Sequence, residues 1–206
     1  SGLSATQIKG LSSTDIGELS DNQVAFLTTS QLTALTTTQI DSLGTTQIGQ
    51  LQATQISGLT ATQLDYLSTT NIAALTTTQA NALTTAQVGA LSTAQIGQME
   101  TADVRAINTT SLKSLSSTQI EALATAQVQA LSTAQVKALE TAQVQALKTE
   151  QVAALVTAQA AALSSAQVAA LATSQVNALS TEGVAALQTS ALRGLGTEGI
   201  QALSTN

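Results

Sequence analysis

Leucine recurs every eight residues along the whole chain, and this spacing dominates the pattern of hydrophobic and polar positions. The register runs from Leu3 to Leu203 without an insertion or deletion, and 24 of its 26 positions hold Leu. The other two hold Met99 and Ile107, which are also apolar. Repetition at a fixed period predicts a solenoid, in which each unit buries its apolar residues against neighbouring units. We therefore expect a single uninterrupted array over residues 1–206, with no linker.

Each column of the eight-residue unit has its own chemical character. Residues 131–138 represent the unit and read Leu-Ser-Thr-Ala-Gln-Val-Lys-Ala. The Val136 column holds Val, Ile or Leu everywhere except at Ala80 and Ala160, and the Gln135 column holds Gln at 18 of 25 positions. Charged residues avoid the Leu and Val columns completely. Each unit is therefore expected to bury two aliphatic side chains and to present its variable positions to solvent.

The period of eight predicts a separate short helix in every unit. In one continuous helix, eight residues at about 100° each would leave a drift of about 80° per unit, so the Leu column would spiral around the helix. The break has recognisable chemistry, because residues 132–135 match the capping box Ser/Thr-x-x-Glu/Gln before an apolar run. We expect Ser132 to cap the first turn and Gln135 to reach back to the cap. Where Glu140 precedes Thr141, Thr141 is the expected cap, and the same holds after Lys148 and Val156.

A β-solenoid is the alternative to this all-α solenoid. Strand alternation would place Leu131, Thr133 and Gln135 on one face, and so mix apolar and polar side chains. The corners of β-solenoids usually need Gly, Asn or Pro, whereas this chain has no Pro and 12 Gly in 206 residues. Strong helix formers are frequent in the C-terminal half. These observations favour helices.

A weaker periodicity of 24 residues lies above the octad. In the small-residue column, every third unit, starting at Gly10, holds Gly or Ala as far as Ala202. The larger residues of that column fall in the other two thirds of the units, namely Glu18, Phe26, Ser42, Gln50, Tyr66, Gln98 and Ser114. We therefore hypothesise three octads per turn of the solenoid.

Composition excludes several classes of function. The chain has no Cys and no His, so thiolate or imidazole metal sites and histidine general bases are absent. Its formal net charge is −6, with only 9% charged residues, which disfavours nucleic-acid binding. Its apolar runs are too short to span a bilayer, so no membrane insertion is expected. The prediction is a protein that is not an enzyme, with no catalytic, cofactor-binding or metal-binding residues and no cofactor.

A few polar clusters are candidate sites. Asp103 and Arg105 lie in the most irregular stretch of the array, from residue 99 to 115, and we interpret them as repeat drift. Asp15, Glu18 and Asp21 are spaced three apart, which could suggest a cation. No loop with the six to eight oxygen ligands of a calcium site is visible, so these carboxylates are interpreted as solubilising. The glycines 194, 196 and 199 resemble a phosphate-binding loop only in their number.

Threonine, glutamine and the two aromatic residues suggest surface roles. Runs such as residues 76–78 could form a Thr-rich, ice-binding or adhesive face, although helix capping already explains one Thr column. The Gln column could form a hydrogen-bonded ladder or serve the capping box. Phe26 and Tyr66 are five units apart and could be exposed anchors for a partner, but an aromatic that fills a local void or shields an end is the more common case.

The unit resembles the octapeptide-repeat segments of large bacterial surface or secreted proteins, which contain long arrays of Leu-Ser/Thr-Thr-x-Gln-Ile/Val-x-Ala. This resemblance covers the whole chain, and it implies an architecture more specifically than a function. The string Leu-Ser-Thr-x-Gln-Val-x-Ala-Leu is also similar to the first helix of TAL-effector repeats. The base-reading loop, the second helix and the basic charge of those repeats are absent, so DNA binding is not carried over.

The sequence thus predicts a structural or spacer protein that projects or connects modules, or that assembles end to end into a fibre. The alternative is a surface-binding module that uses a Thr-rich face. An extracellular or cell-surface location is weakly favoured, and end-to-end self-association is the one expected partner interaction.

Overall fold

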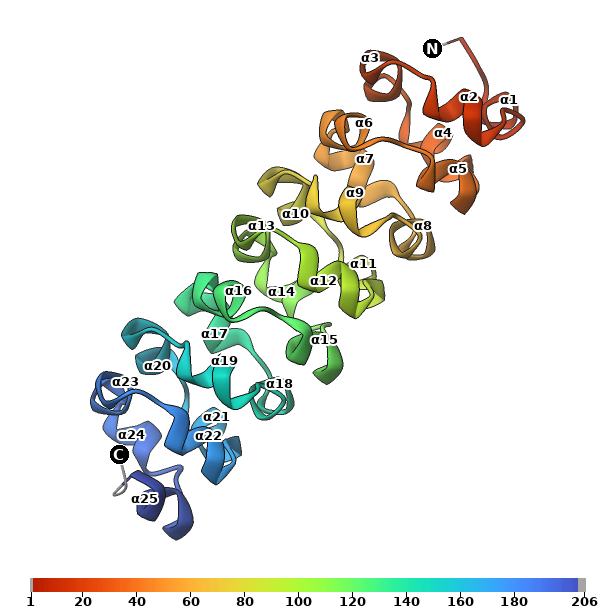
Figure 1. Ribbon diagram of the computed structural model, residues 1–206. Coiled ribbons are helices and arrows are strands. Elements are labelled where there is room, and N and C mark those ends of the chain that lie inside the picture. The colour runs from red at the N-terminus through yellow and green to blue at the C-terminus, as the bar shows by residue number, and fades with distance from the viewer. Residues whose placement is uncertain (1, 204–206) are drawn as a thin grey trace. The chain divides into compact units, whose positions relative to one another are not determined.

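The protein is an all-α solenoid, as the octad pattern predicts. A computed structural model describes residues 2–203, and in that part of the chain it contains 25 helices of four to seven residues and no strand (Figure 1). The chain forms two compact units, Ser1–Ser114 and Leu115–Asn206. The Leu register continues from one unit into the other without extra residues.

In each octad, one residue caps the start of a helix, and the helix ends at the Leu column or shortly before it. In α17 (Thr133–Ala138), the Ser132 hydroxyl accepts a hydrogen bond from the Gln135 N–H at 3.2 Å. The Gln135 side-chain oxygen accepts one from the Ser132 N–H at 2.8 Å. Both halves of the predicted capping box are therefore present. The helix ends at Leu139, whose extended backbone (φ −57°, ψ 137°) turns the chain into the next octad.

The position predicted for the cap was wrong in three octads. Where no Ser or Thr precedes the Thr column, the caps are Glu140, Lys148 and Val156, and their side chains make no capping hydrogen bond. Thr141 is instead the first residue of α18. The Glu140 N–H donates to the Gln143 Oε1 at 2.9 Å, which keeps half of the capping box. The octad therefore keeps its register even where its usual capping side chain is missing.

A missing cap can be restored by mutation. Ala172 caps α22 (Thr173–Ala178) with the same extended backbone as Ser132 and is exposed, but it has no side-chain oxygen. We expect Ala172→Ser to raise the free energy of unfolding by about 1 kcal/mol, because the new hydroxyl can accept from the Gln175 N–H. Urea unfolding followed by circular dichroism measures the change. Ala169→Ser, at an exposed position inside α21, is the control and should lower stability slightly; equal effects of the two variants would contradict the capping argument.

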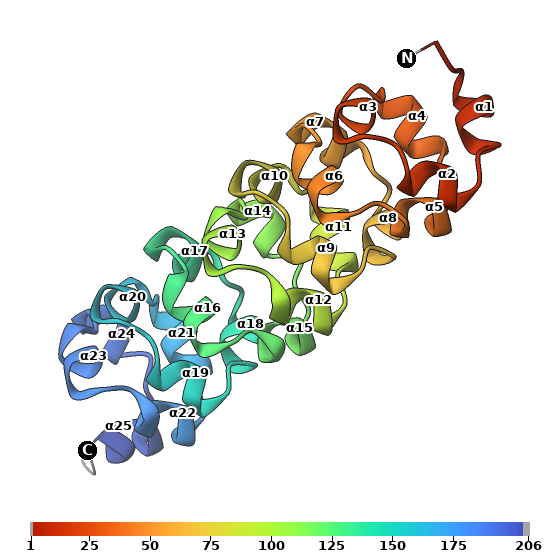
Figure 2. The ribbon, with the colours of Figure 1, turned by 45° about the horizontal axis from the view of Figure 1, so that its top comes forward.

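The helices stack with a period of three, which confirms three octads per turn. In the first unit, each helix contacts the third helix after it, so three columns of helices form. Figure 2 shows one such contact, with α7 beside α10. The first column contains α1 (Ala5–Lys9), α4 (Thr29–Ala34), α7 (Ala53–Gly58), α10 (Thr77–Ala82) and α13 (Thr101–Ala106). The second contains α2 (Ser13–Gly17), α5 (Thr37–Asp41), α8 (Ala61–Asp65), α11 (Thr85–Ala90) and α14 (Thr109–Leu112), and the third contains α3 (Asp21–Ala25), α6 (Thr45–Gln50), α9 (Thr69–Ala73) and α12 (Thr93–Gln98).

The second unit repeats this arrangement. Its helices also contact every third helix along the chain. One column contains α15 (Ser117–Ala122), α18 (Thr141–Gln145), α21 (Ser165–Ala170) and α24 (Thr189–Leu192). The next contains α16 (Thr125–Ala130), α19 (Thr149–Ala153), α22 (Thr173–Ala178) and α25 (Thr197–Leu203), and the last contains α17, α20 (Thr157–Ala162) and α23 (Thr181–Ala186).

The core is built from the two aliphatic columns. In a typical octad Ile48 is fully buried and Leu51 is 3% exposed, and the same holds along most of the array. Because these columns supply one Leu and, in most octads, one β-branched Val or Ile, the core needs no aromatic rings. The Gln column is buried to the same extent, as in Gln87 at 1% exposure. A buried amide must find hydrogen-bond partners, and these partners define the most regular polar feature of the molecule.

Candidate functional site

The buried glutamines form a hydrogen-bonded ladder, which we call the glutamine ladder and which runs from Gln31 to Gln175. Gln87 shows its geometry. Its Oε1 accepts from the N–H of Thr84 at 2.9 Å, within its own octad. Its Nε2 donates to the carbonyl oxygens of Ile56 at 2.7 Å and Leu59 at 2.8 Å, in the preceding turn. One side chain therefore closes a helix start and joins two successive turns.

The same rung, from Gln Nε2 to the Leu carbonyl 28 residues earlier, recurs in both units at 2.5–2.8 Å. In the first unit the pairs are Gln31–Leu3, Gln39–Leu11, Gln47–Leu19, Gln55–Leu27, Gln63–Leu35, Gln79–Leu51, Gln87–Leu59 and Gln95–Leu67. In the second unit they are Gln143–Leu115, Gln151–Leu123, Gln159–Leu131, Gln167–Leu139 and Gln175–Leu147.

The rung satisfies backbone groups that the short helices leave unpaired. A helix of five or six residues has more free N–H and C=O groups at its ends than bonds inside it. The Leu carbonyl lies in extended backbone just after a helix, so no intrahelical donor can reach it. Glutamine has both a carbonyl oxygen and an NH₂ group, and so it can serve the cap and the preceding turn together. The sequence offered the ladder and the capping box as alternatives, whereas the structure combines them.

Shorter polar residues replace Gln at two places and keep the rung. The Asn71 Nδ2 donates to the Leu43 carbonyl at 2.8 Å, and the Ser111 Oγ donates to the Leu83 carbonyl at 2.8 Å. Half of the capping box is lost in exchange, because neither side chain accepts from the N–H of its own N-cap residue, although Ser68 and Asn108 still cap their helices. A shorter side chain therefore reaches one of the two partners only.

Asp103 is different, because its carboxylate has no hydrogen-bond partner among the described residues, and its oxygens are not fully shut off from solvent. The residue is 3% exposed and occupies the Gln position of α13, whose cap is Glu100. Burial raises the pKa of Asp103 to about 6, and the neighbouring Glu100 carboxylate adds to the rise. Sequence reasoning interpreted Asp103 as repeat drift. Its place in the Gln column was the signal that it would be buried.

The ladder ends before the last turn that the structure describes. The final three positions of the Gln column are Gly183, Ala191 and Gly199, which have no side-chain donor. The helices α23, α24 and α25 still contact α20, α21 and α22. This last turn is therefore held by apolar packing without rungs.

The three carboxylates of the acidic trio near the N-terminus are not gathered into one group. Asp15 accepts hydrogen bonds from the N–H and the hydroxyl of Ser12, at 2.8 and 2.7 Å. These bonds to Ser12 lower the pKa of Asp15. Glu18 ends α2 and Asp21 begins α3, and both are exposed. Among residues 2–203, no group of three or more acidic, His or Cys side chains could hold a metal ion.

The glycines near the C-terminus serve packing. A Cβ on Gly194 would collide with the carbonyl oxygen of Ser165 in the preceding turn, so only Gly fits there. Gly196 and Gly199 line a cavity of about 430 Å³ together with Leu171 and Thr173. A Cβ on Gly58 would likewise collide with the Thr29 side chain in the preceding turn. This contact explains why Gly58, which belongs to the 24-residue series of small residues starting at Gly10, has no larger side chain.

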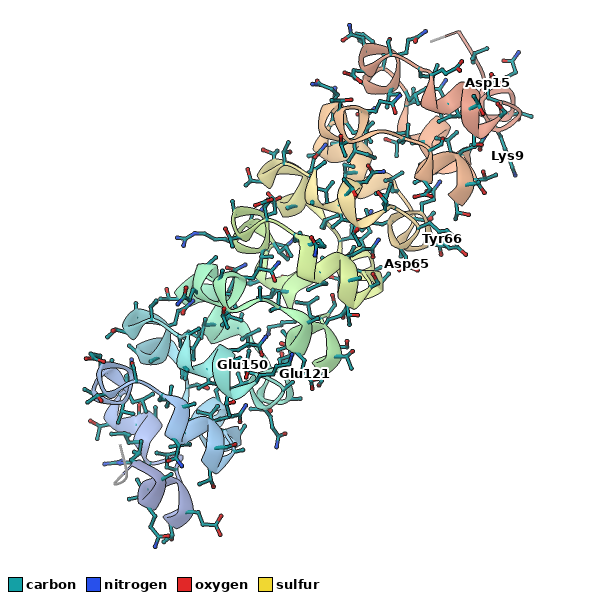
Figure 3. The ribbon with its side chains drawn as sticks, in the orientation of Figure 1. Lys9, Asp15, Asp65, Tyr66, Glu121 and Glu150 are labelled. Atoms are coloured by element: carbon teal, nitrogen blue, oxygen red, sulfur yellow. The ribbon has the colours of Figure 1, made fainter. Side chains whose placement is uncertain are left out.

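Neither aromatic side chain fills a void in the core, which was one of the two roles in the favoured interpretation; the other was to shield an end. Tyr66 is 56% exposed at the end of α8, where Figure 3 shows it on the outside of the stack beside Asp65. Phe26 is 74% exposed and lines two hollows of about 380 and 360 Å³, the first of which also contains Leu3 and Leu19. The first hollow lies at the N-terminal turn of the unit, so Phe26 covers part of that turn.

Comparison with known proteins supports the repeat architecture. A family model described as the ALTTAQ repeat matches residues 61–93, 72–101, 96–133 and 123–157. The four overlapping matches confirm a tandem repeat in the central part of the chain, and the chain is similar to that family there. No curated protein matches the chain. Over the described residues, no helix is both long and apolar enough to cross a membrane.

Proposed function

We propose that the protein is a spacer, a repeat array that holds other modules apart or connects them. The observation that carries this proposal is the glutamine ladder, which joins successive turns within each unit by the same bond to the backbone until the last turn, where Gly and Ala replace Gln. Such an array can set a distance by the number of its turns, because each turn adds the same contacts. The absence of Cys and His and the low share of charged residues are consistent with a role that rests on regular packing.

The spacer proposal predicts that length follows the number of turns. Small-angle X-ray scattering would be measured on the chain and on a variant in which residues 77–100, one full turn, are duplicated. We expect the maximum dimension to increase while the cross-sectional radius stays the same. A variant with two added copies should give twice the increment. An unchanged maximum dimension with a larger cross-section would contradict the proposal.

The fibre form of this proposal requires contact between the ends of two copies. Gln7 and Gln23, in the first turn, use their Oε1 atoms for their own caps and have no acceptor for Nε2 among the described residues. A further turn would offer such acceptors. Asp15, between them, can only accept, and it would oppose a stacked carbonyl. We therefore favour the spacer over the fibre, and a sedimentation series that showed concentration-dependent growth would reverse this preference.

A surface-binding role is the second candidate, because the structure leaves the Thr column free of capping duty. The residue before it is the N-cap, and Thr29, Thr77 and Thr101 are exposed as the first residues of α4, α10 and α13, which stack in one column. Their hydroxyls are available to an ordered surface such as ice. Thermal hysteresis of the chain, compared with a variant carrying Ala at these three positions, separates this role from the spacer role. A spacer shows no hysteresis in either protein.

A further inference from the structure

The glutamine ladder lacks one rung in the first unit, between the positions of Asp103 and Leu75. Asp103 is 3% exposed, and its carboxylate has no hydrogen-bond partner among the described residues, so its oxygens are not fully shut off from solvent. The Leu75 carbonyl lies 28 residues earlier, the spacing of every rung, and it accepts no hydrogen bond in the described structure. Leu75 is only 4% exposed. Elsewhere in the first unit, from Leu3 to Leu83, each Leu carbonyl at this spacing accepts a side-chain donor.

Asn71 shows that a side chain of this length can make the missing bond. Its Nδ2 reaches the Leu43 carbonyl, also 28 residues earlier, at 2.8 Å. Aspartic acid has the same shape as asparagine, but an ionised carboxylate can only accept hydrogen bonds. An ionised Asp103 therefore brings an acceptor toward an acceptor. A protonated Asp103 has an O–H in place of the Asn71 N–H and can donate to the Leu75 carbonyl oxygen.

The surroundings of Asp103 offer little to stabilise its negative charge. The helix packed against it from the preceding turn, α10, contains no titratable side chain. Its own helix carries Glu100 at the cap, which repels a second carboxylate, and Arg105 in the last turn. Because burial and Glu100 both favour the neutral form, the pKa of Asp103 rises to about 6.

We propose that Asp103 forms a rung only when it is protonated. Its neutral carboxyl then donates to the Leu75 carbonyl oxygen and joins α13 to the segment that leads into α10. Loss of the proton to solvent removes the bond and leaves two acceptors opposed. The array thus contains one link between turns that responds to pH, whereas its Gln rungs carry no titratable group. This property is independent of whether the protein acts as a spacer.

The sign of the pH dependence follows from the two pKa values. In the unfolded chain the Asp103 pKa is close to its ordinary value of 3.8, and in the folded chain it is about 6. The folded state therefore binds the proton more tightly, and the resulting stability is fully present below pH 3.8 and is lost as the pH rises through 6. For a shift of this size, the unfolding equilibrium constant should increase about tenfold between pH 5 and pH 7.5 through this group alone.

The matched variant is Asp103→Asn, which installs a permanent donor of the kind already present at Asn71. We expect this variant to be more stable than the parent protein at pH 7.5 and to lose the tenfold dependence between pH 5 and pH 7.5. Urea unfolding of the full chain at both pH values measures this. Hydrogen exchange, corrected for intrinsic rates, should show faster opening of the α13 amides at pH 7.5 in the parent protein but not in the variant.

Asp65→Asn controls for the removal of one negative charge, because Asp65 is exposed on α8. It should keep the pH dependence of the parent protein. A direct readout is the carboxyl carbon shift of Asp103 in an NMR titration, which should have its midpoint near 6. A midpoint near 4, or the same pH dependence in Asp103→Asn and the parent protein, would overturn the proposal.

Discussion

Replacement of Gln87 by Leu is expected to lower the free energy of unfolding by about 2–4 kcal/mol. Leu places an apolar side chain of similar size at this buried position. It has no hydrogen-bonding group, so the bond at the helix start and the bonds to the preceding turn are both lost. The Thr84 N–H and the Leu59 carbonyl, each bonded to Gln87 in the folded protein, then lack a partner. The Ile56 carbonyl still accepts from the Leu59 N–H at 3.1 Å, so it costs less. Urea unfolding followed by circular dichroism measures the loss.

Gln98→Leu is the matched control for this prediction. Gln98 is the last residue of α12 and is exposed, so its replacement should change stability by no more than about 0.5 kcal/mol. Gln87→Asn is a second informative variant, because Asn71 shows that a shorter amide keeps the bond to the preceding turn. It should lie between the parent protein and Gln87→Leu. If Gln87→Leu were as mild as Gln98→Leu, the ladder would not contribute to stability.

The second large effect is expected from the aliphatic core. Val152 is fully buried in α19, and Val156, four residues later, is 45% exposed at the cap of α20. Val152→Ala should cost about 2–3 kcal/mol, because it removes buried methyl groups and leaves a cavity. Val156→Ala removes the same atoms from a solvent-exposed position and should cost less than about 0.5 kcal/mol.

This pair separates burial from residue type within one stretch of chain. The unfolding midpoints of both variants are compared with that of the parent protein under identical conditions. Ala160 occupies the Val152 position in the next octad, so the array tolerates one Ala there. Equal losses from Val152→Ala and Val156→Ala would mean that the Val column does not form the core.

Most of the fold could be predicted from the octad pattern. The Leu and Val columns predicted the buried residues, the Ser132–Gln135 pair predicted the capping box, and the small-residue series starting at Gly10 predicted three octads per turn. The caps predicted after Glu140 and Val156 were one residue too late. That prediction assumed that a cap requires a Ser or Thr side chain. The backbone bond from the N-cap N–H to Gln is enough to keep the start in place.

The ladder could be predicted only in part. A column of Gln indicates a shared structural role, but the partner of Nε2 is a backbone carbonyl 28 residues away, and no residue type marks that position. The same limit hid Asp103, since its raised pKa depends on burial and on the neighbouring Glu100 carboxylate. The tight packing at Gly194 likewise depends on the backbone of Ser165, which has no signature in the local sequence.

The main-chain acceptor in each rung has a consequence for how such a protein can arise. Every residue has a carbonyl group, so a rung makes no demand on the side chain at the position it binds. A newly duplicated turn of three octads brings its own glutamines, and it keeps small residues such as Gly58 in register with the turn before. Unequal recombination in whole turns can therefore lengthen or shorten the gene while the rungs keep their spacing.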